Sequence, residues 1–273
     1  FTRFIIVFSM LRQALGLQQA PPNQVLIGLA LFMSALVMGP TLSEVNDQAI
    51  QPYMAGEMDT SVALETAIAP MRRFMLSNTR RDDLSAVMNM GRIAAPESLN
   101  EIPTTAVVSA FVLSELKTAF VIAIKVYLPF LVIDIVIANV LLSMGMMVLP
   151  PVIISLPFKL MLFVLMDGWN LLVRSMAAGL EESDMSIEEA IVWGQQSIYA
   201  VMTICGPILL AALVVGLFIS ILQAVTQINE MTLVFVPKIA SVFLVILLMG
   251  SWMLDQAVSF GVQSFESISN VND

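Results

Sequence analysis

The sequence predicts an all-α membrane protein built from helical hairpins, and three observations lead to this fold class. Of the 273 residues, 58% are hydrophobic and only 12% are charged, whereas a soluble domain has about 25% charged residues. The mean hydropathy is +0.90. Apolar runs rich in leucine, isoleucine, valine and methionine recur along the chain and exceed the usual length of a strand. Apolar surface on this scale must face lipid or other subunits.

Each apolar run is expected to form a helix, and all but the first two are long enough to span a membrane. The runs cover about 1–15, 25–39, 106–124, 127–149, 152–173, 198–222 and 232–254. Turn-forming residues divide two pairs of neighbouring runs, at Pro150-Pro151 and at 223–232. Each of these stretches is therefore expected to be the tip of a hydrophobic hairpin.

The segment 41–105 is polar and carries five arginines mixed with acidic residues. It predicts a small α-helical insertion outside the membrane, in which Leu84, Val87 and Met88 share one helix face after a weak capping pattern of Thr79 and Asp82. Arginines near the first short loop place that loop in the cytoplasm, so the insertion is expected in the periplasm. Its own arginines do not reverse this, because segments longer than about 60 residues cross regardless of charge.

A second helix start follows the polar residues 181–184. Ser186 and Glu189 form a capping box, and Glu188 and Glu189 fall in a first turn. From the residues alone, two joined proteins and one protein with a polar linker both fit this pattern.

Composition also excludes several kinds of function. The net charge of -9 argues against a nucleic-acid partner. The single cysteine, Cys205, excludes an internal disulfide, and the absence of histidine removes the commonest metal ligand and general base. Neither a nucleophile–base pair nor a phosphate-binding glycine loop is found, so we expect no enzyme activity, no cofactor and no metal.

Specific motifs carry a resemblance to two families. Residues 1–180 resemble the FliP family, without its N-terminus, through LRQALG at 11–16, APPNQVLIG at 20–28, SELKTAF at 114–120 and LPFKLMLFVLMDGW at 156–169. Residues 185–273 resemble the FliQ family through GQQ at 194–196, TQINEMTL at 226–233 and PKI at 237–239. The resemblance implies a FliP-like domain, a junction at 181–184 and a FliQ-like helical hairpin, joined naturally or by engineering.

These families imply a structural and gating role in type III protein export. FliP-like and FliQ-like subunits build a helical conduit, through which unfolded flagellar proteins cross the bacterial inner membrane at the flagellar basal body. The implied partners are a FliR-like subunit, further FliP and FliQ copies, the export proteins FlhA and FlhB, and membrane lipid. The sequences PPNQ at 21–24 and QINEM at 227–231 favour the flagellar branch over the homologous virulence injectisome.

A proton-coupled secondary transporter is a further alternative to the export gate. That class predicts internal repeats around broken helices with a substrate site at mid-membrane. The two halves of this sequence show no such repeat, which favours the export reading.

Methionines at the first hairpin tip are candidates for a pore seal. Methionine is flexible and polarizable, so a ring of such tips could close a pore and still deform around varied peptides. The resemblance implies a methionine gasket formed by Met144, Gly145, Met146 and Met147. Val148 stands where many family members have a further methionine.

Ionisable residues inside apolar runs are costly, and they are usually buried in protein or face water. They are Glu115, Lys117, Lys125, Asp134, Lys159, Asp167, Glu230, Lys238 and Asp255. Glu115 and Lys117 lie two positions apart, so they point to different helix faces and are not expected to pair with each other. Lys159 and Asp167, eight positions apart, lie about 80° apart around a single helix, which would allow them a shared partner surface. We expect Glu115, Lys117, Asp134, Lys159 and Asp167 to form inter-subunit ion pairs, and a proton relay is the alternative.

The tip of the second hairpin is polar. Amide side chains both donate and accept hydrogen bonds, so a ring of them could close a mouth of the conduit, although a solvated loop also fits. The residues concerned are Gln223, Gln227, Asn229 and Glu230, and Lys238 is a candidate for contact with acidic neighbours or lipid head groups.

Overall fold

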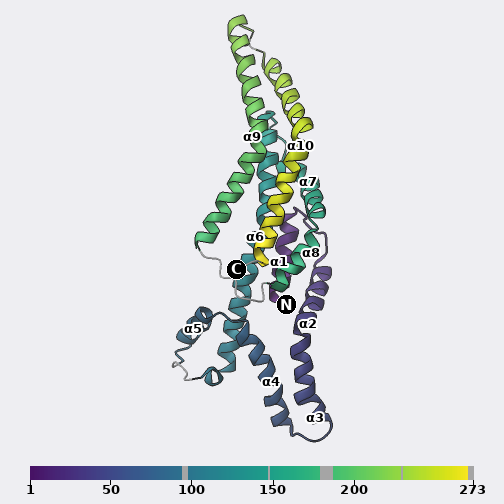
Figure 1. The fold of residues 1–273 in the computed structure, drawn as a ribbon, viewed down its shortest axis with the longest axis vertical. Coiled ribbons are helices and arrows are strands. Elements are labelled where there is room, and N and C mark those ends of the chain that lie inside the picture. Colours follow the sequence, from purple (N-terminus) through teal and green to yellow (C-terminus); the bar gives the residue numbers. More distant parts are fainter. Residues whose placement is uncertain (94–97, 147, 179–186, 229, 270–273) are drawn as a thin grey trace. The chain divides into compact units, whose positions relative to one another are not determined.

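The computed structural model describes residues 1–93, 98–146, 148–178, 187–228 and 230–269. All regular structure within these ranges is helical, which confirms the predicted all-α class (Figure 1). Four helices among the described residues are long and apolar enough to cross a membrane, and a bent pair of helices would make a fifth span.

The N-terminal part holds one short helix and one candidate span. Helix α1 covers Thr2–Ala14, and α2 covers Asn23–Val45 with Pro40 in its interior. A π-helical turn at Asn46–Ile50 and helix α3 at Gln51–Met54 continue α2 without a break. The helical segment therefore extends well beyond position 41, where the polar insertion was expected to begin. A proline removes a single helix hydrogen bond, and the bonds on either side carry the helix through Pro40.

The polar segment that follows is helical, as the sequence predicts. Helix α4 covers Thr60–Ser77, α5 covers Arg81–Met90, and a 3₁₀ turn covers Leu99–Glu101. The predicted apolar face of α5 is confirmed, because Val87 belongs to a buried cluster against which Leu84 and Met88 pack. The other buried members of this cluster are Ile102, Ala106, Val107 and Ala110.

Helix α6 is the longest element of the FliP-like half and covers Thr104–Ser143. The sequence suggested separate runs at 106–124 and 127–149, but one helix of 40 residues contains most of both. Its length is about 60 Å. The lysine between the two runs does not break a helix, and Pro129 is tolerated inside it as prolines are in other membrane helices.

The run at 152–173 is not one helix. Helix α7 covers Pro151–Leu165 and α8 covers Gly168–Ala178, with a bend of 67° between them. Asp167 has a φ of 51°, in the left-handed region that ends helices. A Cβ on Gly168 would lie 2.2 Å from the ring of Phe163, so glycine permits the close return of the chain.

The FliQ-like half is a hairpin of two long helices, α9 at Ile187–Thr226 and α10 at Met231–Ser269 (Figure 1). Its turn falls within the stretch 223–232 predicted for it. Glu188 and Glu189 lie in the first turn of α9, as expected. Ser186 of the predicted capping box and the junction at 181–184 lie outside the described residues.

The chain forms two compact units. One consists mainly of Phe1–Met10 and Gln19–Ala123, and the other of Leu11–Gln18, Ile124–Ala177 and the hairpin of α9 and α10. The second unit has a single apolar core to which α6, α9 and α10 all contribute. Its buried members are Val132, Met144, Ile204, Ile208, Ala212, Val242, Met253 and Phe260. The two halves that the motifs distinguish therefore share one core in the second unit.

Candidate functional site

The turn between α6 and α7 holds the methionines of the predicted gasket. At the end of α6, the amide of Gly145 donates to Leu142 O over 3.0 Å and the amide of Met146 donates to Leu141 O over 2.9 Å. This pair of bonds is a Schellman motif, which ends a helix with a residue in the left-handed region. Gly145 has a φ of 79°, and a Cβ there would lie 2.8 Å from the ring of Phe235. Glycine therefore fixes the turn.

The gasket residues differ in their surroundings. Met144 is buried in the core of the second unit, and Met146 packs half-buried against the same core. Met147 lies outside the described residues. Val148 is 96% exposed. Met144 and Gly145 thus shape and support the turn, while Met146 and Val148 lie nearer its surface.

The buried Lys159 forms an ion pair within the chain with Asp134, which is 24% exposed. Lys159 Nζ lies 2.6 Å from Asp134 Oδ2 and donates to Ala14 O, at the end of α1, over 3.0 Å. Ser155 Oγ donates to Asp134 Oδ1 over 2.6 Å. Lys159 is 3% exposed, so its charge depends on these oxygens. The group connects α1, α6 and α7 within the second unit.

Arg3 and Glu115 form a second buried pair, inside the first unit. Arg3 Nε donates to Glu115 Oε2 over 3.1 Å, and Arg3 Nη2 donates to Glu115 Oε1. This two-pronged geometry is the strong form of a guanidinium–carboxylate contact. The side chains are 4% and 12% exposed, respectively, so the pair joins α1 to α6 away from water.

The other predicted pairing residues have neighbours in the same chain. Lys117 Nζ lies 3.8 Å from Asp83 Oδ1, so Lys117 and Glu115 have different partners, as their spacing predicts. Asp167 accepts a hydrogen bond from Asn170 Nδ2 over 3.0 Å. It does not share a helix with Lys159, because α7 ends at Leu165, and the expected common helix surface is wrong. Inter-subunit pairing of the five residues remains a prediction.

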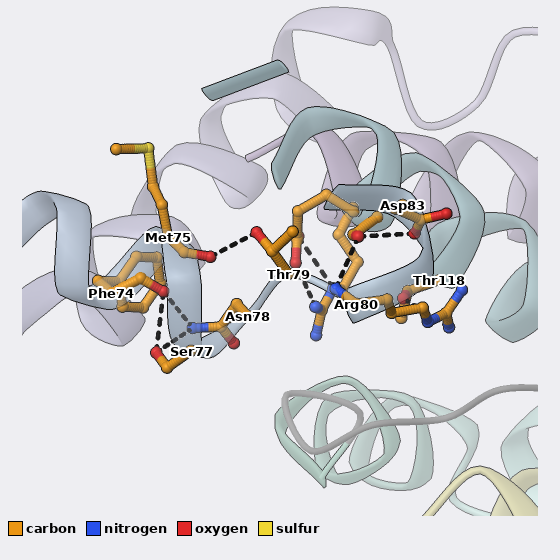
Figure 2. A network of polar contacts seen from close by, with 11 residues as sticks. Phe74, Met75, Ser77, Asn78, Thr79, Arg80, Asp83 and Thr118 are labelled. Carbon is orange, nitrogen blue, oxygen red and sulfur yellow. Dashed lines mark hydrogen bonds and ion pairs between the residues drawn. The ribbon is translucent and has the colours of Figure 1, made fainter. Parts of the chain in front are cut away.

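A buried polar network joins α5 to α6 and was missed by the sequence reasoning. The Arg80 amide donates to Ser114 Oγ over 3.0 Å, and Ser114 Oγ donates to Asp83 Oδ2 over 2.7 Å. Arg80 Nη2 donates to Thr118 Oγ1 over 3.1 Å. Figure 2 shows Arg80, Asp83 and Thr118 close together in this network. Ser114 and Thr118 are one helix turn apart in the SELKTAF motif, and that spacing was the available signal.

The capping pattern predicted at Thr79 and Asp82 is wrong. Helix α5 begins at Arg81, and Arg80 at its cap position makes no side-chain capping bond. Thr79 Oγ1 instead donates to Met75 O over 2.6 Å, at the end of α4 (Figure 2). The Thr79 hydroxyl thus bonds to a carbonyl at the end of the preceding helix, and the Ser114 hydroxyl accepts the hydrogen bond of the Arg80 amide.

Replacing Ser114 with alanine is expected to destabilise the chain by about 1–3 kcal/mol, because it leaves the buried Arg80 amide and one Asp83 oxygen without this partner. Denaturant unfolding of the purified chain in detergent measures the loss. Ser109 is the matched control, since its exposed hydroxyl on the same helix donates only locally, to Thr105 O. Ser109→Ala is expected to change stability by less than about 0.5 kcal/mol. Equal effects of the two variants would contradict this role of Ser114.

The tip of the second hairpin is partly ordered by its own amide groups. Gln223 Nε2 donates to Glu230 O over 2.6 Å, and Gln227 has a φ of 56° that turns the chain. Asn229 lies outside the described residues. Lys238 is half-buried in α10, and its Cε lies 3.8 Å from the Cβ position of Gly216 in α9. The amide ring remains a prediction.

Three features define the class of protein. Helices of up to 40 residues dominate it, four of them can span a membrane, and the buried Lys159 is paired with Asp134 inside the fold. Among the described residues, no group of three or more histidine, cysteine or acidic side chains is placed to hold a metal ion. The chain is therefore a multi-pass helical membrane protein.

The chain belongs to the FliP family, which matches residues 1–176. Residues 189–261 match a second family, the bacterial export proteins of family 3, to which FliQ belongs. The chain is thus a fusion of two export-apparatus domains.

Similar proteins match the first domain at high identity. The flagellar biosynthetic protein FliP of Bacillus subtilis (strain 168) is 53% identical over 176 residues, which are 64% of this chain and 80% of that protein. The protein of the same name from Pectobacterium carotovorum is 51% identical over 177 residues, 65% of this chain and 69% of that protein. The one from Cereibacter sphaeroides is 51% identical over 178 residues, 65% of this chain and 59% of that protein.

Proposed function

We propose that the chain is a structural and gating subunit of the flagellar type III export channel, through which unfolded flagellar proteins cross the bacterial inner membrane. Its relatives carry the name flagellar biosynthetic protein, and both of its domains match families of the export apparatus. It works with a FliR-like subunit, further FliP and FliQ copies, FlhA and FlhB. The insertion that contains α4 and α5 faces the periplasm, and residues 181–184 separate the two domains.

One observation carries the gating part of the proposal, namely the α6–α7 turn. A left-handed glycine ends a helix of membrane-spanning length, and the chain then continues through the half-buried Met146 to Val148, which is 96% exposed. Copies of this turn around a common axis would line a constriction with flexible apolar side chains. Such a lining excludes hydrated ions and yields to a passing polypeptide.

Replacing Met146 and Met147 together with alanine is expected to increase ion leakage through the assembled complex severalfold, because the shorter side chains leave the constriction open. Conductance across planar bilayers or in cells measures this effect. Met90→Ala is the control, since Met90 is 81% exposed in α5 and belongs to the insertion. The control variant is expected to leak like the unchanged protein.

The outcome that contradicts the gasket is unchanged conductance in a complex that still assembles and exports flagellar proteins. Loss of the complex itself would instead show that the methionines pack the core. Quantifying assembled complex beside conductance separates these two results.

A further inference from the structure

The last turns of α10 are the most deeply buried part of that helix. Phe265 and Ser264 are both 0% exposed, and Ile268 is 3% exposed. Farther up the same helix, Phe243 is 59% exposed. The family match of the second domain covers residues 189–261, so these buried residues follow the matched range.

This segment packs closely on the first domain within the second unit. A Cβ on Gly261 would lie 2.8 Å from Met166 Sδ, 3.8 Å from Pro129 Cβ and 3.9 Å from Leu162 Cδ2. Small residues at Gly261 and Ser264, three positions apart, allow helices to approach this closely. The helix end therefore lies against α6, α7 and the bend before α8.

Two polar side chains of the first domain reach backbone carbonyls at this helix end. Ser175 Oγ, in α8, lies 3.0 Å from Phe265 O, and it shares its one hydrogen between this carbonyl and Leu171 O of its own helix, which lies 2.7 Å away. Lys125 Nζ, in α6, donates to Ser267 O over 3.1 Å. The last carbonyls of a helix lack partners inside it and carry partial negative charge, so a cation is the favoured partner there.

Lys125 is a buried first-domain residue whose charge is paired through this contact. It is 1% exposed, and a buried ammonium is costly unless it is paired. Its carbonyl partner comes from α10, and Glu189, which interacts with it electrostatically, comes from α9. The second domain thus supplies both oxygen-bearing groups to a cation that belongs to the first domain.

We propose that residues 262–269 are a docking segment, which seats the second domain on the first domain of the same chain through a receptor formed by Lys125, Ser175 and Met166. Because the two domains are covalently linked, each is always close to the other. Each chain therefore enters an assembly with its two domains already associated. The proposal concerns pairing inside one chain and holds whether or not the chain forms an export channel.

The test uses the full chain with a specific protease site inserted at Ser183. After cleavage of the purified protein in detergent, the two fragments of the unchanged chain are expected to elute together. Phe265→Ala is expected to weaken their association at least about 100-fold, because truncating a buried phenylalanine costs about 3–5 kcal/mol and each 1.4 kcal/mol is tenfold. Ending the chain after Gly261 is expected to separate the fragments as well.

Phe243→Ala is the matched control, with the same chemical change at an exposed position of α10. It is expected to leave the fragments together. Helicity and a single elution peak before cleavage show that each variant has folded. If the chain ending at Gly261 stays associated after cleavage, the apolar core of α6, α9 and α10 holds the domains together instead, and the docking segment is overturned.

Discussion

Replacing Lys159 with methionine is expected to lower the free energy of unfolding by about 3–5 kcal/mol, because it leaves the Asp134 carboxylate without its cation. The hydrogen bond to Ala14 O, which connects α7 to the end of α1, is lost as well. Methionine has nearly the length of lysine, so the change removes charge without leaving a large cavity. Denaturant unfolding of the full chain in detergent measures the difference.

A double variant separates the loss of a charge from the loss of packing. Combining Lys159→Met with Asp134→Leu is expected to recover most of the lost stability, since replacing both members of a buried pair with apolar groups is often close to neutral. Lys117→Met is the control, because Lys117 is 51% exposed and its carboxylate neighbour is 3.8 Å away. Its effect is expected to stay below about 1 kcal/mol. If the double variant is as unstable as Lys159→Met, the loss of stability does not come from the unpaired Asp134 carboxylate.

Reversing the charge at Glu115 is expected to abolish or strongly reduce the amount of chain that assembles into a complex. Glu115→Arg places a second guanidinium beside Arg3, and both positions are largely buried. Breaking such a pair costs about 3–5 kcal/mol, and like charges add to this cost. Reversing the partner in the same chain, Arg3→Glu, is expected to restore most of the assembled protein. Native gel analysis of detergent extracts measures the recovery.

Co-expression decides whether this pair forms within one chain or between two. The structure places Arg3 and Glu115 together in one chain, whereas the sequence suggested inter-subunit pairing. Two co-expressed chains, one carrying Glu115→Arg and the other Arg3→Glu, are therefore expected to remain defective. Recovery in that mixture would show that the carboxylate finds its arginine on a neighbouring subunit.

The fold class and the hairpins could be predicted because hydropathy and turn residues act locally. The turn after Thr226 and the apolar face of Val87 follow from the composition of a few neighbouring residues. The continuous helix α6 was less obvious, because Lys125 and Pro129 look like an interruption in a hydropathy pattern. Neither residue ends α6. Lys125 finds a hydrogen-bond acceptor in Ser267 O, and Pro129 is accommodated within the helix.

The partners of the buried charges could not be predicted, because they depend on contacts between distant segments. The positions of Glu115 and Lys159 inside apolar runs indicated a need for partners, but Arg3 lies 112 positions from Glu115. Asp134 and Lys159 are closer in sequence, and an α6–α7 hairpin brings them together. The Arg80 network could not be predicted because serine and threonine are common in apolar helices, where they usually bond to the backbone of their own helix. Ser114 and Thr118 therefore gave no indication of a partner in another helix.

The bend between α7 and α8 has a consequence for the surrounding lipid. Helix α7 has 15 residues, so it is about 22 Å long, against a hydrocarbon core of about 30 Å. After a turn of 67°, an α8 that follows a membrane-normal α7 runs closer to the membrane plane than to its normal. Helix α7 by itself cannot cross a bilayer of ordinary thickness, so a crossing by this bent pair also needs the contribution of α8 along the membrane normal. Where lipid surrounds α7, the bilayer has to thin, and such hydrophobic mismatch costs fractions of a kcal/mol per Å. In that setting the acyl-chain length of the lipid is a physical variable that acts on α7 and α8.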